Sequence, residues 1–294
     1  MRLIVISGLS GSGKSIALNV LEDAGYYCVD NLPSWLLPQL VGRLEQEGQP
    51  AVAVAIDVRG GESIRDLPHQ LQSLSATGVA PRFLFLDAKD EALIQRFSET
   101  RRRHPLVAED RTLPEAIAEE RQRVSRLACL GHRIDTSDLK PGTLRTWVKQ
   151  FIAAPADAAA AGVTVVFQSF GFKHGVPLDA DLVFDVRCLP NPFYEPDLRA
   201  QTGLDAPVAS YLEQHAETGR MFEDIRGFVE RWLPDYVKDG RSYLTVAIGC
   251  TGGQHRSVYL VERLGKALSG QLQALVRHRE ITIATPGKPA APTR

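Results

Sequence analysis

Residues 8–15 carry the clearest chemical motif of the chain, a glycine-rich loop that ends in lysine and serine. The segment reads Gly-Leu-Ser-Gly-Ser-Gly-Lys-Ser and fits the spacing G-x-x-x-x-G-K-[ST]. Its glycines allow a tight fold that turns backbone N–H groups toward a polyphosphate. Lys14 can reach the terminal phosphates, and the Ser15 hydroxyl can ligate Mg²⁺. The motif predicts a nucleoside triphosphate site formed by Gly8, Leu9, Ser10, Gly11, Ser12, Gly13, Lys14 and Ser15.

The residues on either side of this loop supply the structural context that the motif needs. Residues 3–6 form a β-branched run typical of a buried strand, and residues 16–21 begin a helix-like pattern. The amino end of that helix adds partial positive charge where a phosphate would lie. This strand–loop–helix order favours a nucleotide site over a glycine-rich turn that matches the pattern by chance.

The first half of the chain alternates apolar strand-like runs with helix-like segments. Continuous apolar strands between helices are typical of a parallel sheet covered on both faces. We therefore predict an α/β fold in which residues 1–153 form a kinase-like domain with a phosphate-binding loop. The expected strands are residues 3–6, 26–29, 51–56, 82–86 and 132–134, and the expected helices are 33–47, 61–76, 89–102, 114–127 and 143–153.

A change of composition separates the second half of the chain. Residues 154–162 are mostly Ala, Pro, Asp and Gly, which predicts a linker, although the alanines also suit a helical turn. Residues 163–280 indicate a second, smaller α/β domain, and the proline-containing residues 281–294 indicate a disordered tail. Its expected strands are residues 163–167, 182–184, 243–248 and 272–276, and its expected helices are 208–214, 221–237 and 258–269.

Three predicted strands of the first half end in an acid: Asp30, Asp57 and Asp87. Because ligands bind beyond the carboxyl ends of parallel strands, these carboxylates are candidates to hold Mg²⁺ through water or to accept a proton. Each of them is equally suited to cap the following helix. We take Lys14, Asp30 and Asp87 as candidate catalytic residues.

Arginines near these acids suit phosphate binding. Arg59 follows Asp57 and can grip a phosphate through two N–H groups, or form a structural ion pair instead. Arg96 and the run Arg101-Arg102-Arg103, which His104 and Pro105 follow, stand where small kinases carry a mobile lid, and Pro105 ends the preceding helix. The alternative for this run is a solvated helix end whose cations complement the helix dipole.

Residues 249–257 form a second strand-to-helix loop, Gly-Cys-Thr-Gly-Gly-Gln-His-Arg-Ser. Its backbone N–H groups and Arg256 suit an anion. The spacing of Cys250 and Arg256 also matches cysteine-dependent phosphatases, in which the thiolate is the nucleophile. Gly249 stands where those enzymes usually have His, and no Asp is placed as a general acid. Anion binding is thus favoured over covalent catalysis, and Cys250 alone also suits a small buried hydrophobe.

Other polar residues follow strands of the second half. Lys173 and His174 lie in a glycine-flanked turn, and Asp185 ends another strand. A sugar phosphate needs both cations and a partner for its hydroxyls, which this set supplies.

The composition excludes several classes of protein. The net charge of −1 argues against a chain whose whole surface binds nucleic acid, although residues 241–279 hold six Lys or Arg and one acid, which suits RNA or a solvated surface. The four scattered cysteines fit neither a disulfide framework nor a zinc site. No apolar run approaches the ~18 residues that span a bilayer. We expect a cytoplasmic protein without membrane contact.

With these residues considered together, the chain resembles the RapZ (YvcJ-like) family of bacterial nucleotide-binding proteins. The resemblance extends from Met1 to about Arg279, and the combination of two loop motifs is more specific than the first loop alone. The matching stretches are residues 10–15, 21–33, 169–175, 185–187, 189–192 and 241–253.

The resemblance implies a kinase-like first domain that binds ATP and GTP and hydrolyses them slowly, with a second nucleotide motif at Asp57, Val58, Arg59 and Gly60. It also implies a regulatory second domain that senses glucosamine-6-phosphate, binds small regulatory RNAs and presents them to a ribonuclease. The implied ligand residues are Lys173, His174, Asp185, Ser242, Cys250, Thr251, Gly252, Gly253, His255 and Arg256.

The chain departs from the enterobacterial members in its last residues. Their RNA-binding tail is rich in Lys and Arg, whereas only Lys288 and Arg294 are basic beyond Arg279 here.

We also expect the chain to associate with itself. The alternative functions are a small-molecule kinase and a cysteine-dependent phosphatase.

Overall fold

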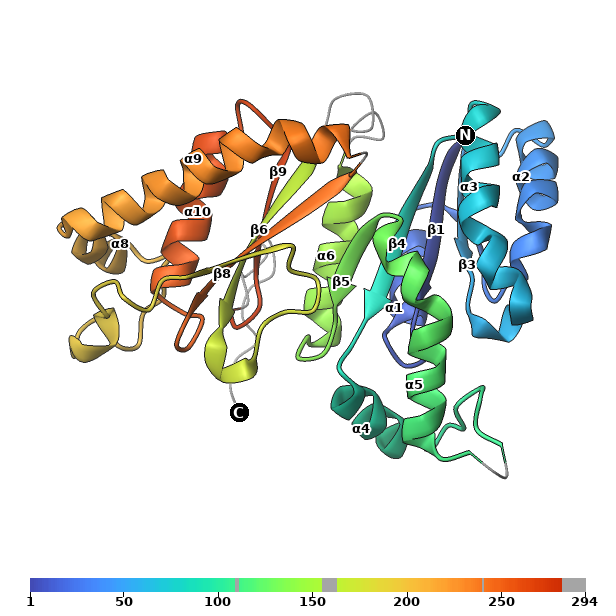
Figure 1. Ribbon diagram of the computed structural model, residues 1–294, viewed down its shortest axis with the longest axis horizontal. Coiled ribbons are helices and arrows are strands. Elements are labelled where there is room, and N and C mark those ends of the chain that lie inside the picture. Colours follow the sequence, from blue (N-terminus) through green and yellow to red (C-terminus); the bar gives the residue numbers. More distant parts are fainter. Residues whose placement is uncertain (109–110, 155–162, 240, 282–294) are drawn as a thin grey trace.

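The computed structural model describes residues 1–108, 111–154, 163–239 and 241–281, which form two parallel β-sheets with helices packed on their faces (Figure 1). The expected linker and tail fall largely on residues 155–162 and 282–294, which lie outside the described residues. The predicted α/β class is confirmed, since every strand pair in both sheets is parallel among the described residues.

The first sheet has the order β2-β3-β1-β4-β5. Its central strand leads into the phosphate-binding loop, as the strand-like run at the chain's start predicted. The neighbours of this strand end close to the same loop, so their carboxyl ends border one edge of the sheet. The strands are β1 (Arg2–Gly8), β2 (Tyr27–Val29), β3 (Ala51–Ala55), β4 (Pro81–Asp87) and β5 (His132–Asp135).

Alternate residues of β1 enter two separate cores, which is why the strand is apolar throughout. Leu3 and Val5 pack in one core, and Ile4 and Ile6 pack in the other. Helices α2 (Leu37–Gln46), α3 (Leu67–Ala76), α4 (Asp90–Thr100) and α5 (Leu113–Val124) contribute to the first core, and α1 (Lys14–Asp23) and α6 (Pro141–Ala153) to the second.

One expected helix, over residues 61–76, differs in the structure. Residues Val58–Asp66 form 3₁₀ turns (η2), and the α-helix begins only at Leu67. Gly61 has φ +73°, which no α-helix accommodates, and Pro68 lies in the first turn of α3, where its missing N–H is harmless. Short 3₁₀ helices also occur at Ser34–Leu36 (η1) and Ser125–Cys129 (η3).

The second sheet has the order β7-β8-β6-β9. Its first strand is longer than the expected 163–167 and runs on to Gly171, because the polar residues Gln168 and Ser169 are buried and remain paired with β8. The strands are β6 (Thr164–Gly171), β7 (Leu182–Asp185), β8 (Tyr243–Cys250) and β9 (Ala274–His278). The helices are α8 (Ala206–Glu213), α9 (Ala216–Lys238) and α10 (Arg256–Leu268), with 3₁₀ helices η4 (Phe172–His174) and η5 (Pro192–Tyr194).

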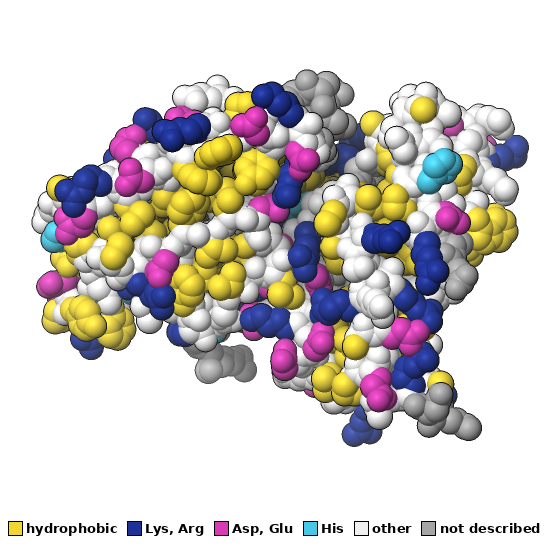
Figure 2. Space-filling model, viewed as in Figure 1, with side chains coloured by type: hydrophobic (Ala, Val, Ile, Leu, Met, Phe, Trp, Pro, Cys, Tyr) yellow, Lys and Arg dark blue, Asp and Glu magenta, His cyan; other side chains and the backbone are white. Residues whose placement is uncertain are grey.

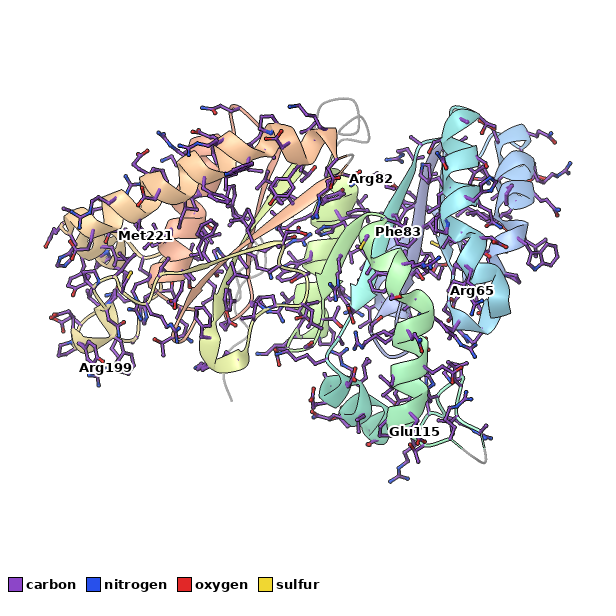
Figure 3. The ribbon with its side chains drawn as sticks, viewed as in Figure 1. Arg65, Arg82, Phe83, Glu115, Arg199 and Met221 are labelled. Carbon is purple, nitrogen blue, oxygen red and sulfur yellow. The ribbon has the colours of Figure 1, made fainter. Side chains whose placement is uncertain are left out.

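The two sheets meet through buried side chains around α6, which lies between them in Figure 1. Arg277 of β9 is buried, its Nη1 lies 2.7 Å from His132 Nε2, and its guanidinium lies over the Trp147 ring. Arg82, labelled in Figure 3, donates to the Tyr243 hydroxyl at 3.1 Å from the side of β4. These contacts hold the first domain (β1 to α6) against the second (β6 to β9).

No helix among the described residues is both long enough and apolar enough to cross a membrane.

Candidate functional site

The phosphate-binding loop occupies the corner between β1 and α1. Gly8, Gly11 and Gly13 all have positive φ, at 140°, 84° and 103°. A Cβ on Gly8 would lie 2.0 Å from the Leu86 carbonyl oxygen, so only glycine fits between β1 and β4. The sequence pattern thus follows from the backbone that the corner requires.

The loop borders a cavity of about 600 Å³. Residues 10–16 line one side of it, and arginines from several elements line the others. Exposed Ser15 also lies on its wall. The cationic lining suits a ligand with several negative charges. The arginines are Arg59, Arg96, Arg102 and Arg103.

Lys14 is held inside this corner by main-chain oxygens. Its Nζ donates to Gly8 O at 2.8 Å and to Leu9 O at 3.0 Å, and lies 4.0 Å from Asp57 Oδ2. Burial lowers the pKa of Lys14, while the carboxylates of Glu120 and Asp57 raise it in part. A buried ammonium with acceptors of this kind is ready to exchange them for phosphate oxygens.

Asp57 follows β3 and points into the same cavity. It accepts the Arg59 backbone N–H at 2.9 Å and the Arg59 Nη2 at 2.6 Å. Burial acts to raise the pKa of Asp57, but the Arg59 hydrogen bonds and the Lys14 charge hold it below its ordinary value. Arg59 forms the structural ion pair that was one of its two expected roles, and its side chain also lines the cavity. Val58 is buried beneath this turn, which ends at Gly60.

The other two acids are placed differently. The cavity lining among the described residues includes neither Asp30 nor Asp87. Asp30 is exposed beyond β2, and its charge acts to raise the pKa values of Lys14 and Arg59. Asp87 is buried and accepts hydrogen bonds from Arg121 Nη1 at 2.9 Å and from Arg133. The structure therefore does not bring the candidate catalytic residue Asp87 to Lys14, because two arginines occupy its carboxylate.

The arginine run expected to form a lid lies beside the cavity only in part. Arg102 and Arg103 line it, whereas Arg101 ends α4 in a left-handed conformation with φ 51°. Arg96 is a further lining cation that donates to Gly11 O at 3.1 Å and to Thr136 Oγ1 at 3.1 Å. Burial lowers the pKa of Arg96. Arg96 thereby connects the phosphate-binding loop to Thr136 at the wall of the cavity.

Sequence reasoning missed Glu120 and His104, which lie against the loop. Glu120 Oε2 accepts the Ser10 N–H at 2.9 Å and lies 3.0 Å from His104 Nε2, and both side chains are fully buried. Glu120 stands in the charged stretch Glu-Glu-Arg-Gln-Arg, so no single-residue signal sets it apart. Only its spacing from Ile117 and Val124, both buried, places it on the inward face of α5.

The second loop occupies the corner between β8 and α10, as expected. Cys250 Sγ accepts the Gly253 N–H at 3.2 Å and lies 3.2 Å from Ser257 Oγ. Burial acts to raise the pKa of Cys250, but these hydrogen bonds lower it below its ordinary value. The loop therefore stabilises negative charge at its floor.

Arg256, the first residue of α10, is only 4% exposed. Its Nη1 donates to Arg187 O at 2.8 Å and to Leu189 O at 3.0 Å, and its Nη2 lies 3.3 Å from Thr251 Oγ1. Its Nε is buried and has no hydrogen-bond partner among the described residues. Arg256 thus fixes the 187–189 turn beside the loop, and its buried Nε is a donor whose hydrogen bond is not satisfied by the described residues.

Several residues implied by the resemblance gather at this corner. The Lys173 N–H donates to Thr251 O at 3.3 Å, and the exposed His174 follows in the same turn. Asp185 pairs in register with Gly249 and accepts Arg187 Nη2 at 2.6 Å. Gly253 has φ +70° and lies at the turn of the loop with Gly252.

Two other residues implied by the resemblance, His255 and Ser242, differ in their position relative to the second loop. His255 is buried against the main chain of residues 198–201, and burial lowers its pKa. The expectation that Ser242 belongs to the phosphosugar site is not met by its position in the fold. Ser242 precedes β8 and lines a cavity of about 400 Å³ with Asp181 and Arg241, whereas Cys250 lies at the opposite end of that eight-residue strand. A strand separates residues that lie close in sequence, so Ser242 does not join this loop.

Comparison with solved structures gives partial matches to kinases. A shikimate kinase from Bacteroides thetaiotaomicron is 12% identical, with a TM-score of 0.35 over 51% of this chain and 98% of that chain. A gluconokinase from Sinorhizobium meliloti is 20% identical, with a TM-score of 0.35 over 52% of this chain and 91% of that chain.

Curated relatives match almost the whole chain. A nucleotide-binding protein of Aromatoleum aromaticum is 61% identical over 95% of this chain and 94% of its own length. A nucleotide-binding protein of Azoarcus sp. shows the same identity and coverage. One from Dechloromonas aromatica is 56% identical over 96% of this chain and 99% of its own length.

Family models agree with this assignment. The RapZ-like N-terminal domain matches residues 1–156, and the RapZ C-terminal domain matches residues 163–282. These spans contain the two loops described above. By these matches and by its curated relatives, the chain belongs to the RapZ family.

Proposed function

We propose that the chain is a nucleotide-binding regulator. Its first domain binds and slowly hydrolyses a nucleoside triphosphate, and its second domain binds a phosphorylated amino sugar. The observation that carries the proposal is the phosphate-binding loop, whose buried Lys14 opens on an arginine-lined cavity of about 600 Å³. The names of the curated relatives support nucleotide binding.

The cavity suits ATP and GTP with Mg²⁺. Mg²⁺ prefers oxygen ligands and usually keeps phosphates and waters around it, so few protein ligands are needed. The exposed Ser15 hydroxyl on the cavity wall fits this role, and the lining also includes Asp57, whose Oδ2 lies 4.0 Å from Lys14 Nζ. Among the described residues, no group of three or more His, Cys, Asp or Glu is placed to hold a metal ion by itself.

The second loop suits the phosphate of a sugar such as glucosamine-6-phosphate. Backbone N–H groups converge on Cys250 Sγ, and Arg256, whose buried Nε has no partner among the described residues, supplies positive charge beside them. Asp185, beside the loop, is an acceptor suited to sugar hydroxyl or ammonium groups. The predicted contacts with small RNA, a ribonuclease and a second copy of the chain belong to the same proposal. On the face of the molecule that Figure 2 shows, acidic and basic side chains are interspersed.

Two measurements test the proposal. Phosphate release from ATP and GTP with Mg²⁺ is expected in the wild type and absent in Lys14→Ala. Calorimetry with glucosamine-6-phosphate is expected to show binding that glucosamine and Arg256→Met both lack. Absence of either signal in the wild type removes that half of the proposal.

A second candidate function is supported by one observation, the hydrogen bonds that stabilise a thiolate at Cys250. In a cysteine-dependent phosphatase this sulfur would form an S–P bond as the alcohol leaves and takes a proton from water, and a second water would release phosphate. Aryl phosphate hydrolysis that is lost in Cys250→Ser and kept in Cys188→Ser supports this activity. Hydrolysis that survives Cys250→Ser excludes it.

A further inference from the structure

Glu120 joins the phosphate-binding loop to the segment that follows the lid arginines. Its Oε2 accepts the Ser10 N–H at 2.9 Å, and its Oε1 accepts the Ser10 hydroxyl at 2.9 Å. The same Oε2 lies 3.0 Å from Nε2 of His104, which directly follows Arg103. One carboxylate thereby holds two segments that both face the nucleotide cavity.

Helix α5 places this carboxylate by ordinary helical spacing. The helix begins with a capping box in which Thr112 and Glu115 bond each other, and Figure 3 labels Glu115 at that end. Ile117 and Val124 lie three residues before and four residues after Glu120, and both are buried in the core. Glu120 therefore shares their inward face.

A buried carboxylate is unfavourable unless hydrogen bonds or charges compensate it. For Glu120 the partners are Ser10 and His104, and the Lys14 ammonium lies near enough that Glu120 is the largest charge raising its pKa. A Gln or Met side chain would avoid the desolvation of a charge at this position. The negative charge is thus placed beside the loop at a cost, next to groups that receive phosphate.

The Ser10 N–H is one of the donors that loops of this type turn toward phosphate oxygens. Here it is bonded to a carboxylate. A triphosphate and Glu120 are both anionic acceptors for this one donor. Their like charges repel, so the carboxylate weakens binding of the ground state while it fixes the geometry of the loop.

We propose that Glu120 is a positioning residue for the terminal phosphate, which gives up the Ser10 N–H when nucleotide binds and keeps the lid segment aligned through His104. This role rests on the nucleotide hydrolysis proposed above. Glu120 acts through Ser10 and His104 and needs no contact with the reacting atoms.

The test is Glu120→Gln, which keeps an acceptor for Ser10 and removes the charge. We expect ATP to bind about fivefold to tenfold more tightly, because a like charge is gone. We expect kcat for phosphate release to fall about tenfold, because the lid segment loses its charged anchor. A purely structural residue would weaken binding and turnover together, along with thermal stability.

The matched control is Glu119→Gln on the same helix. Glu119 pairs with Arg111 at 2.6 Å and with Arg123, and among the described residues it forms no hydrogen bond or ion pair with the phosphate-binding loop. Its variant is expected to keep both parameters within about twofold of the wild type. His104→Asn tests the same link from the other side, since it is expected to lower kcat without tightening nucleotide binding.

The outcomes separate the two proposals. A wild type without nucleotide turnover removes the proposed hydrolysis and with it the role of Glu120. An active wild type whose Glu120→Gln variant keeps its Kd and kcat, or loses both in step with its melting temperature, overturns the role of Glu120 alone. If Glu120→Gln does not fold, an unchanged kcat in His104→Asn gives the same negative answer.

Discussion

Asp135 and Arg279 form an ion pair that crosses the boundary between the two domains. Arg279 Nη2 lies 3.4 Å from Asp135 Oδ2, and its Nη1 donates to the Asp135 carbonyl oxygen at 3.1 Å. Both side chains are buried, at 0% and 4% exposure for Asp135 and Arg279. Asp135 is the last residue of β5 in the first domain, and Arg279 directly follows β9 in the second.

The neighbours of this pair reach both loops. Thr136 Oγ1 donates to the Ser12 carbonyl oxygen at 3.0 Å in the phosphate-binding loop. Glu280 packs against Gly253 so closely that a Cβ there would lie 2.4 Å from its Oε2. A continuous path of contacts therefore runs from one loop to the other through Asp135 and Arg279.

Asp135→Asn is expected to destabilise the protein by about 3–5 kcal/mol at pH 7, because it leaves Arg279 buried with less compensation. Burial acts to raise the pKa of Asp135, but Arg279 and the hydrogen bonds to Ser137 and Leu178 hold it below its ordinary value. The carboxylate stabilises the fold at pH values above the pKa of the unfolded chain and ceases to do so as the pH falls through its folded pKa. Thermal unfolding from pH 7 down to pH 3 checks this, and melting temperatures that differ equally throughout would contradict it.

Lys14→Ala is expected to weaken triphosphate binding about tenfold or more, the effect of losing a charge-assisted hydrogen bond of about 1.5–3 kcal/mol. Nucleotide titration by calorimetry measures the change. Lys149→Ala serves as control, because Lys149 is an exposed residue of α6. Equal affinities in all three proteins would rule out phosphate contact by Lys14.

Arg256→Lys is expected to weaken glucosamine-6-phosphate binding about tenfold. Lysine keeps the charge but lacks the guanidinium group, whose Nη1 donates to Arg187 O and Leu189 O. Arg263→Lys is the matched change on the same helix, where Arg263 contacts Tyr259 and the Phe222 ring instead of the loop. Displacement titration compares the two. A larger effect of Arg263→Lys would place the ligand elsewhere.

The sequence predicted those features that depend on neighbouring residues. Each strand-to-helix corner needs glycine, an apolar strand before it and a helix after it, and these requirements are all local. The order of the elements followed from the same alternation. The helix over residues 61–76 was too long because the positive φ of Gly61 is set by the turn after Asp57, which sequence periodicity does not report.

The features that the sequence did not predict depend on which residues the fold brings together. Asp87 has the same strand-end position as Asp57, yet Arg121 and Arg133 from α5 and β5 occupy it. Ser242 lies close in sequence to Cys250 and a strand's length away in space. Glu120 looks like a solvated charge until α5 is packed against the loop. Such pairings lie far apart in the sequence, so single-residue patterns do not reveal them.

Glu280 gives a pH-dependent prediction at the second loop. Burial, with a smaller effect of Asp138, raises its pKa from 4.5 to about 7, although Arg279 and the Gly171 N–H oppose the shift. Between these two pH values the folded protein keeps a proton that the unfolded chain releases, so the free energy of unfolding falls as pH rises. Glu280→Gln lacks this proton release, so its melting temperature is expected to match the wild type near pH 4.5 and to exceed it above pH 7.

Glu45→Gln, on the exposed side of α2, is expected to follow the wild type at every pH. Parallel curves for Glu280→Gln and the wild type would show that the carboxyl group at Glu280 ionises in the folded protein as it does in the unfolded chain.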